Sequence, residues 1–191
     1  NGKFLLSFNG EIYNYLELKK KLINLGFKFN GNSDTEVLLC AWQAWGEKVL
    51  SLLSGMFSFS IVDLINRKIY LVRDIFGIKP LYWTKNVNGF FFSSEIKPLL
   101  EINNCKPKAE LSTTLQYLKY GYTDRNKSTF FSDIHKIEPA KIYEFSLDNF
   151  DKLNVYTYWD LKPQKKCVSF KTASKQLKDI FLTSVKQHLR S

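Results

Sequence analysis

Three clusters of polar residues combine side-chain types and spacings that could do chemistry. Asn9-Gly10-Glu11 directly follows an apolar run, and Ser-Asp-Thr-Glu occupies residues 33–36. The third cluster is Arg73-Asp74, followed within a few residues by Gly77 and Lys79. None of the three matches a phosphate-binding loop, a set of metal ligands or a Ser/His/Asp pattern. Taken singly, the clusters predict no more than a soluble α+β domain.

The Asn9-Gly10 dipeptide has two interpretations. A side-chain amide and a nearby backbone N–H can point at one spot and stabilise the negative oxygen of a tetrahedral intermediate, as in an oxyanion hole. The glycine would let the backbone approach closely. The same dipeptide is also the strongest short signal for a type I′ hairpin turn. From the dipeptide alone, the turn is the favoured interpretation.

Two carboxylates, Glu11 and Asp34, could recognise a cationic amine or an amide NH₂, because ionised carboxylates accept such donors well. For Asp34 the alternative is a favourable place in the first turn of a helix, near the positive end of its dipole. Glu36 follows Ser33 at the capping-box spacing S-x-x-E, and capping suffices to explain it. For Arg73-Asp74 we expect a structural ion pair or a turn.

Hydrophobic periodicity predicts the elements that position these residues. Residues 3–8 are predicted as a strand that ends at the Asn9-Gly10 turn. A helix is predicted over 15–25, ended by Gly26, and a second helix is predicted to begin at Ser33. The predicted apolar faces are Tyr15, Leu18, Leu22 and Leu25 in the first helix and Val37, Leu38, Ala41, Ala44 and Trp45 in the second.

After Gly55 the hydrophobic period changes to two, which is typical of strands. The first hundred residues therefore predict a strand, two helices and an antiparallel meander, an α+β arrangement and not a parallel βαβ sheet. The strands expected in the meander are 56–64, 68–74, 77–85 and 89–94. Further on we expect helices over 95–100, 111–120 and 172–189, and a hairpin of 140–147 with 155–161.

Composition weighs against several classes of function. The formal net charge is +10, yet 24 of the 28 basic residues are Lys spread along the chain. This favours a solvated surface over a nucleic-acid interface, which would concentrate charge and use Arg. No apolar stretch approaches the roughly 20 residues of a membrane helix. We therefore expect neither nucleic acid nor a membrane as a partner.

The cysteines and histidines are isolated along the sequence. With an odd number of cysteines and no C-x-x-C spacing, we expect no disulfide framework, no metal site and a reducing, cytoplasmic setting. The residues concerned are Cys40, Cys105, Cys167, His135 and His188. Cys40 falls inside the second predicted helix among apolar neighbours, so we expect a packed structural thiol.

In combination the motifs are more specific than any one of them. N-G-E-I-Y-N (9–14), S-D-T-E-V-L-L (33–39), G-M-F (55–57) and R-D-I-F-G-I-K-P-L-Y (73–82) occur in this order, followed by S-S-E-I-K-P-L-L (93–100). With them the sequence resembles the class II glutamine amidotransferase domain of glutamine-hydrolysing asparagine synthetases over nearly the whole chain. Glucosamine-phosphate synthases and phosphoribosyl amidotransferases share that fold but are less similar in these stretches.

The resemblance implies an α+β fold of the N-terminal-nucleophile hydrolase type. This fold is a four-layer αββα sandwich with two antiparallel sheets, here expected to be truncated at its N-terminus. Residues 1–160 would be a partial amidotransferase domain, and residues 161–191 a linker and the first helix of a partial synthetase domain. Because the first residue is Asn and not Met, we expect the chain to start within a longer polypeptide.

The resemblance also implies an activity. In the family, the thiolate of an N-terminal Cys attacks glutamine, and the released ammonia passes through a tunnel to a second domain. There, aspartate activated by ATP captures the ammonia to give asparagine. Glutamine is thus the implied substrate of this chain, while aspartate, ATP and magnesium would belong to the missing domain, and the full-length protein could form a homodimer. We expect no cofactor and no metal in residues 1–191 themselves.

Individual roles carry over only where residues match the family's motifs. Asn9 and Gly10 match the oxyanion hole, and Glu11 and Asp34 match residues that hold glutamine. The residues expected to support the site without doing chemistry are Arg73, Asp74, Gly77 and Lys79. The nucleophilic Cys has no counterpart at residue 1, and Cys40, with no free amine, cannot replace it. We therefore expect this chain to be inactive by itself.

Two alternatives to an asparagine synthetase stay open. The first is an amidotransferase of the same family that aminates another carboxylate, for example in polysaccharide or secondary metabolism. The second is a non-catalytic relative that keeps the scaffold for binding or regulation. The acceptor pocket and the N-terminal Cys would distinguish them, and both lie outside residues 1–191.

Overall fold

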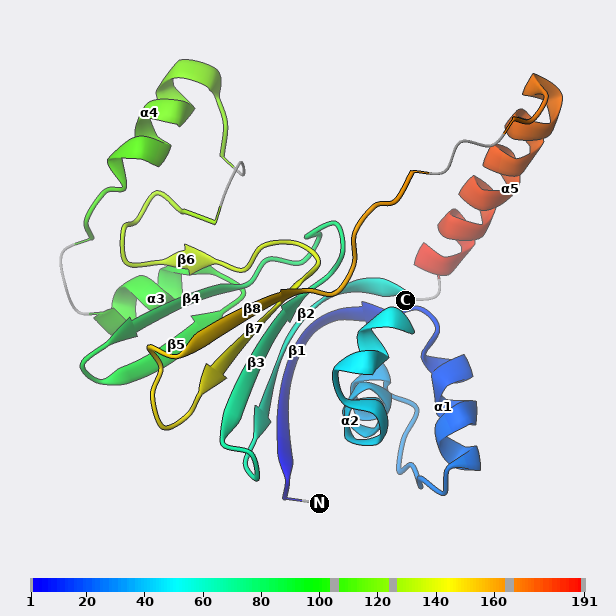
Figure 1. The fold of residues 1–191 in the computed structure, drawn as a ribbon, viewed down its shortest axis with the longest axis horizontal. Coiled ribbons are helices and arrows are strands. Elements are labelled where there is room, and N and C mark those ends of the chain that lie inside the picture. Colours follow the sequence, from blue (N-terminus) through cyan, green and yellow to red (C-terminus); the bar gives the residue numbers. More distant parts are fainter. Residues whose placement is uncertain (1, 104–106, 124–126, 164–166, 190–191) are drawn as a thin grey trace. The chain divides into compact units, whose positions relative to one another are not determined.

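The computed structural model describes residues 2–103, 107–123, 127–163 and 167–189 (Figure 1). Cys105 and part of the linker predicted from residue 161 lie outside these ranges. The chain divides into two compact units, residues 1–10 with 56–159 and residues 11–55 with 160–191. Each unit is discontinuous in sequence, so contacts between distant segments hold each one together.

The strands form two sheets (Figure 1). The larger sheet has the order β1-β2-β3-β7-β8 and the smaller one β5-β4-β6. The strands of the larger sheet are β1 (Phe4–Ile12), β2 (Gly55–Asp63), β3 (Lys68–Arg73), β7 (Lys141–Ser146) and β8 (Leu153–Thr157). Those of the smaller sheet are β4 (Tyr82–Asn86), β5 (Gly89–Ser93) and β6 (His135–Lys136).

The antiparallel pairing is confirmed, but the single predicted meander is wrong. Strand β3 pairs with β2 and, on its other side, with β7, where Leu71 lies opposite Tyr143. The β4–β5 hairpin belongs to the smaller sheet instead, where β4 also pairs with β6. The chain leaves the larger sheet after β3 because a hydrogen-bonded turn over residues 74–79 redirects it.

An apolar core joins the two sheets within the first unit. Buried residues of β3 and β7, among them Leu71 and Phe145, form its centre. The ring centroid of Phe145 lies 5.2 Å from that of Trp83 in β4 and 4.4 Å from that of Phe90 in β5. Because these rings come from different sheets, the two sheets pack face to face through aromatic side chains.

Strand β2 is covered on both faces. Phe57, Phe59 and Ile61 are buried, as their alternation predicted. Ser58 and Ser60, which point the other way, are buried as well. The Ser58 hydroxyl donates a hydrogen bond to the carbonyl oxygen of Pro80 at 3.0 Å, which satisfies it in the interior.

The second unit holds the helices that follow β1. They are α1 (Tyr15–Asn24), α2 (Asp34–Trp45) and the 3₁₀ helix η1 (Gly46–Ser51). Helix α1 contacts α2 and buries Leu18 and Leu22, as predicted, whereas Leu25 is exposed. In α2, Val37, Leu38 and Ala41 are buried as predicted, while Ala44 and Trp45 are only partly buried and Trp42 is buried in addition.

The three further helices lie at the predicted places, two between β5 and β6 and one after β8. They are α3 (Ile96–Asn103) and α4 (Leu111–Tyr120) in the first unit and α5 (Phe170–His188) in the second. The Glu110 side chain caps α4, and Gly121, with φ +72°, ends it. The predicted apolar face of α5, Leu177, Phe181 and Val185, is exposed. Within the described ranges, no helix has the length and apolar character needed to cross a membrane.

Candidate active site

Strand β1 continues through Asn9 and Gly10 to Ile12, so the hairpin turn predicted at this dipeptide is wrong. Gly10 has φ +148°, a conformation that side chains with a β-carbon rarely adopt. A β-carbon at Gly10 would lie 2.2 Å from the carbonyl oxygen of Met56 and 2.7 Å from the α-carbon of Phe57. The glycine therefore permits a close approach of β1 to β2, and the chain stays extended where the dipeptide alone predicts a reversal.

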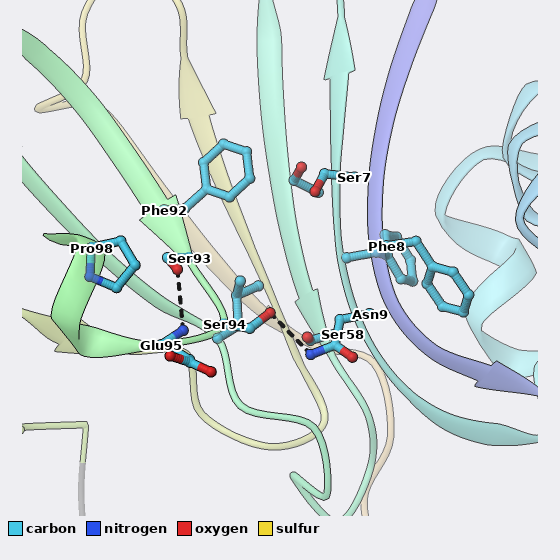
Figure 2. A pocket seen from close by; sticks show the side chains of 12 residues that line it. Ser7, Phe8, Asn9, Ser58, Phe92, Ser93, Ser94, Glu95 and Pro98 are labelled. Atoms are coloured by element: carbon cyan, nitrogen blue, oxygen red, sulfur yellow. Dashed lines mark hydrogen bonds between the residues drawn. The ribbon is translucent and has the colours of Figure 1, made fainter.

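The Asn9 side chain is held from the other sheet. Its amide nitrogen, Nδ2, donates a hydrogen bond to Oγ of Ser94 at 3.0 Å. Figure 2 shows this bond, with Ser94 just beyond the end of β5. Both residues line a cavity of about 320 Å³ that several other serines border, among them Ser7 and Ser58. One N–H of the Asn9 amide is thus fixed, which leaves the second available for another acceptor.

The two candidate carboxylates line a second cavity of about 230 Å³ in the other unit, together with Tyr13 and Tyr15. Oδ2 of Asp34 accepts a hydrogen bond from the backbone N–H of Ile12 at 3.1 Å, which fixes the carboxylate beside the end of β1. Among the described residues, none donates a hydrogen bond to the Glu11 carboxylate. The structure thus brings the carboxylates of Glu11 and Asp34 to one cavity.

The start of α2 positions Asp34. Ser33 is the N-cap, and its Oγ accepts from the backbone N–H of Thr35 at 3.2 Å, so the predicted helix start is confirmed. The second half of the predicted capping box is wrong. The Glu36 carboxylate accepts instead from the backbone N–H groups of Asn30 and Gly31, at 2.9 and 3.0 Å. Glu36 therefore ties the preceding loop to the helix that carries Asp34.

Asn14 supports the same region, and the sequence interpretation missed it. Its Nδ2 donates to the carbonyl oxygen of Leu52 at 2.8 Å, while its Oδ1 accepts from the backbone N–H of Ser54 at 3.0 Å. The backbone N–H of Tyr13 also donates to the Ser54 carbonyl, at 2.7 Å. An Asn directly before a helix usually indicates a cap, and only the folded chain shows that this one holds a distant loop.

Arg73 is a structural residue of the first unit. Its guanidinium donates to three backbone carbonyls, those of Lys79 (2.8 Å), Ile137 (2.8 Å) and Gly77 (2.6 Å), and only 8% of the residue is exposed. A β-carbon at Gly77 would lie 3.1 Å from Cζ of this guanidinium. Arg73 therefore joins the turn after β3 to the chain before β7.

Asp74, next to it, is 1% exposed and accepts hydrogen bonds from four backbone N–H groups. The donors are Phe57, Phe76, Ile78 and Lys79, at distances from 2.9 to 3.3 Å. Buried acceptors of this kind fix a backbone, because each unpaired N–H would be costly in the interior. The Asp74 side chain thus ties the turn after β3 to Phe57 of β2. Phe57 directly follows Met56, whose carbonyl oxygen lies against Gly10.

The thiol that falls inside α2 does not have the properties of a nucleophile. Cys40 is partly buried, and burial, reinforced by the charge of Glu36, raises the pKa of its thiol. A raised pKa keeps the sulfur protonated and unreactive. In the part of the chain that the structure describes, no group of three or more His, Cys, Asp or Glu residues is placed to hold a metal ion.

Comparison with known proteins places this arrangement in a family. The family model for the glutamine amidotransferase domain matches residues 1–159. The chain belongs to this family. Two relatives of this amidotransferase domain are asparagine synthetases [glutamine-hydrolysing] of Bacillus subtilis (strain 168), numbered 3 and 1. They are 31% and 34% identical to it, over 98% of this chain but only 30% and 29% of their own length.

A putative glutamine-hydrolysing asparagine synthetase of Methanocaldococcus jannaschii is 31% identical over 98% of the amidotransferase chain and 36% of its own length. The chain thus spans about a third of the length of these three curated relatives. Among solved structures, glutamine phosphoribosylpyrophosphate amidotransferase from B. subtilis shares the fold, with a TM-score of 0.59 at 20% identity. That likeness covers 83% of this chain and 30% of that one.

These comparisons confirm the predicted family and the N-terminal-nucleophile type of fold. The roles of Asn9, Gly10, Glu11 and Asp34 stay predictions of the sequence, and so does the domain boundary at residue 160. Ser94 is the residue that the sequence interpretation missed at the first cavity. Its only signal was a polar dipeptide, Ser93-Ser94, directly after a predicted strand.

Proposed function

We propose that this amidotransferase domain hydrolyses glutamine and that the ammonia released serves the synthesis of asparagine in a longer protein. Asparagine synthetases that cover 98% of the chain at 31–34% identity support the family of reactions. The observation that carries the proposal for this chain is the extended path through Asn9 and Gly10. It keeps the Asn9 amide and the Gly10 backbone on one extended strand at the edge of the larger sheet, where Ser94 binds the amide.

The proposed role of Asn9 and Gly10 is to bind the oxygen that becomes negative when a thiolate attacks the glutamine carboxamide. The Asn9 amide keeps one N–H beyond its bond to Ser94, and the backbone N–H of Gly10 is proposed as the second donor. Donors that are already oriented stabilise such an oxygen without reorganisation during the reaction. The nucleophilic Cys of this scheme would come from a part of the longer protein outside residues 1–191.

Glu11 and Asp34 are proposed to hold the polar ends of glutamine, its amide NH₂ and its α-ammonium group. Both carboxylates line one cavity, and Asp34 is fixed there because its Oδ2 accepts from the Ile12 N–H and its Oδ1 from the Thr35 hydroxyl at 3.5 Å. An ionised carboxylate binds an ammonium or amide donor with short, charge-assisted hydrogen bonds. Positioning of the substrate by such groups raises the rate by holding the carboxamide in a reactive orientation.

The acceptor of the ammonia is proposed to be aspartate, with ATP and magnesium bound by other parts of the longer protein, which would work in the cytoplasm and could form a homodimer. None of the described residues forms a three-ligand cation site that would place magnesium in this chain. A second candidate is the amination of another carboxylate. A relative with a name other than asparagine synthetase, amidase chry2 from Gibberella zeae, is 31% identical over 81% of this chain and 22% of its own length, so this family is not confined to asparagine synthetases.

The proposal is tested on the protein encoded by the complete gene, by measuring glutamate release from glutamine. Asn9→Ala should lower kcat about 100-fold or more, because it removes one oxyanion donor. Asp34→Asn should mainly raise KM for glutamine, because it removes a charge that binds the ground state and the transition state alike. Asp148→Asn, at an exposed ion pair with Arg67, is the matched control and should change neither constant.

Two results would count against the proposal. Undiminished glutamate release by Asn9→Ala would exclude the oxyanion role, and an unchanged KM in Asp34→Asn would exclude substrate binding by that carboxylate. The 191-residue polypeptide made alone serves as the blank. We propose that it releases no glutamate, because the thiols of Cys40 and Cys167 lack the adjacent α-amino base that the mechanism uses.

A further inference from the structure

We propose that Ser94 is a positioning residue for the Asn9 amide, so that glutamine hydrolysis depends on a hydroxyl that lies 85 positions further along the chain. This inference rests on the proposed function, because it assigns Ser94 a task only if Asn9 donates to the reacting oxygen. Nothing in the local sequence around Asn9 points to this partner. The bond exists because the two sheets of the first unit pack against each other.

The geometry joins the edge strands of two different sheets. Asn9 lies on β1, at one end of the order β1-β2-β3-β7-β8, and Ser94 directly follows β5, at one end of the order β5-β4-β6. The Nδ2–Oγ distance of 3.0 Å is that of a well-formed hydrogen bond, and both residues are partly buried at the cavity that Figure 2 shows. Partial burial protects the bond from competition by water.

An Asn side chain without such a partner is poorly oriented. The last torsion of Asn, about the bond to the amide group, has a broad energy profile, so the amide can rotate or exchange its N and O positions. In the structure the Ser94 oxygen accepts one amide N–H, and this bond restricts rotation of the amide group. The remaining N–H then has a fixed direction before substrate arrives, which is the condition for efficient oxyanion stabilisation.

The experiment uses the protein from the complete gene and compares variants at position 94. Ser94→Ala should lower kcat for glutamine hydrolysis about tenfold, less than the loss from deleting the donor itself, and leave KM within about twofold. Ser94→Thr keeps the hydroxyl and should retain most of the rate. Ser94→Cys replaces the oxygen with a weak acceptor of similar shape and should fall between Ala and wild type.

The double variant of Ser94→Ala with Asn9→Ala distinguishes a positioning role of Ser94 from a purely structural one. If Ser94 acts through Asn9, then Ser94→Ala added to Asn9→Ala should reduce kcat no further than Asn9→Ala alone. A purely structural tie between the sheets would lower the unfolding temperature but leave kcat of the folded protein unchanged. Ser174→Ala, at an exposed serine of α5 that does not line this cavity, is the matched control and should keep wild-type kcat and KM.

The outcomes distinguish this inference from the proposed function. Wild-type kcat in Asn9→Ala overturns the oxyanion role and with it the task of Ser94. A low kcat in Asn9→Ala with wild-type kcat in both Ser94→Ala and Ser94→Cys overturns the inference alone. Should Ser94→Ala fail to fold, Ser94→Cys decides: a reduced kcat that is absent in the Asn9→Ala background supports the inference, and a wild-type kcat refutes it.

Discussion

At Gly10, the absence of a β-carbon decides the course of the chain. The dipeptide Asn9-Gly10 has a strong local preference for a tight turn. In the protein, β1 continues to Ile12, because Gly10 lets the strand pass against the Met56 carbonyl at a distance no other residue tolerates. A long-range contact thus overrides the preference of the dipeptide.

Substitution of Gly10 measures this contact. Gly10→Ala should lower the free energy of unfolding by about 1–3 kcal/mol more than Gly89→Ala, as expected when atoms are forced into a packed region. Gly89 is a matched control: its φ is +141°, close to the +148° of Gly10, but the nearest atom to an added β-carbon is 3.8 Å away. Urea unfolding monitored by circular dichroism gives both values. Equal losses in the two variants would show that the close approach is unimportant.

At the scale of elements, the turn after β3 separates the two sheets. The Asp74 carboxylate accepts from three backbone N–H groups of this turn and from that of Phe57 on β2. The Arg73 guanidinium donates to the Ile137 carbonyl and so joins the turn to the chain before β7. The hydroxyl of Tyr158 donates to the Arg73 carbonyl at 2.7 Å, so the chain beyond β8 supports the same turn. Burial, with the charge of Asp74 beside it, raises the pKa of Tyr158, which keeps its hydroxyl a donor.

Asp74→Asn should destabilise the protein by about 3 kcal/mol or more. An Asn offers one acceptor oxygen in place of two and directs an NH₂ group at buried donors, which leaves N–H groups unpaired. Asp148→Asn, at an ion pair whose side chains are about 60% exposed, should cost less than about 1 kcal/mol. Thermal unfolding of the two variants makes the comparison. Similar losses would contradict the view that Asp74 anchors the turn.

For the whole molecule, we expect the protonation of His135 to make the free energy of unfolding depend on pH. This residue of β6 packs against Trp83, with ring centroids 4.6 Å apart. Burial lowers its pKa, aided by the charges of Lys127 and Lys85, while Asp133 opposes them. The folded protein thus favours the neutral ring, and the unfolded chain binds more protons below about pH 6.5.

The sign of the effect follows from this difference. The stability that neutral His135 contributes is complete above about pH 6.5 and falls as the pH decreases toward the lower pKa of the folded state. Urea unfolding at pH 7.5 and 5.5 measures this change. Between these pH values, the free energy of unfolding should decrease less in His135→Gln than in wild type. An identical loss in His135→Gln and wild type would refute the prediction.

Elements with local signals were predictable before folding is considered. Helical spacing predicted α1, α2 and α4, and Ser33 was correctly predicted as the start of α2, because an N-cap bonds within its own turn. The ordered motifs also determined the family, which the match over residues 1–159 confirms. Periodicity succeeded here because it depends only on which face of a helix or strand is apolar.

Only the tertiary structure decided which distant groups meet. It extended β1 through Asn9-Gly10, placed the β4–β5 hairpin in a second sheet, and directed Glu36 to the loop at Asn30 instead of its own N-cap. It also gave Asn9 its partner Ser94. The Glu36 carboxylate exchanges its capping bond for two bonds to the preceding loop. The path of β1, the second sheet and the Asn9–Ser94 bond depend on packing between segments far apart in the chain, and no local pattern encodes that packing.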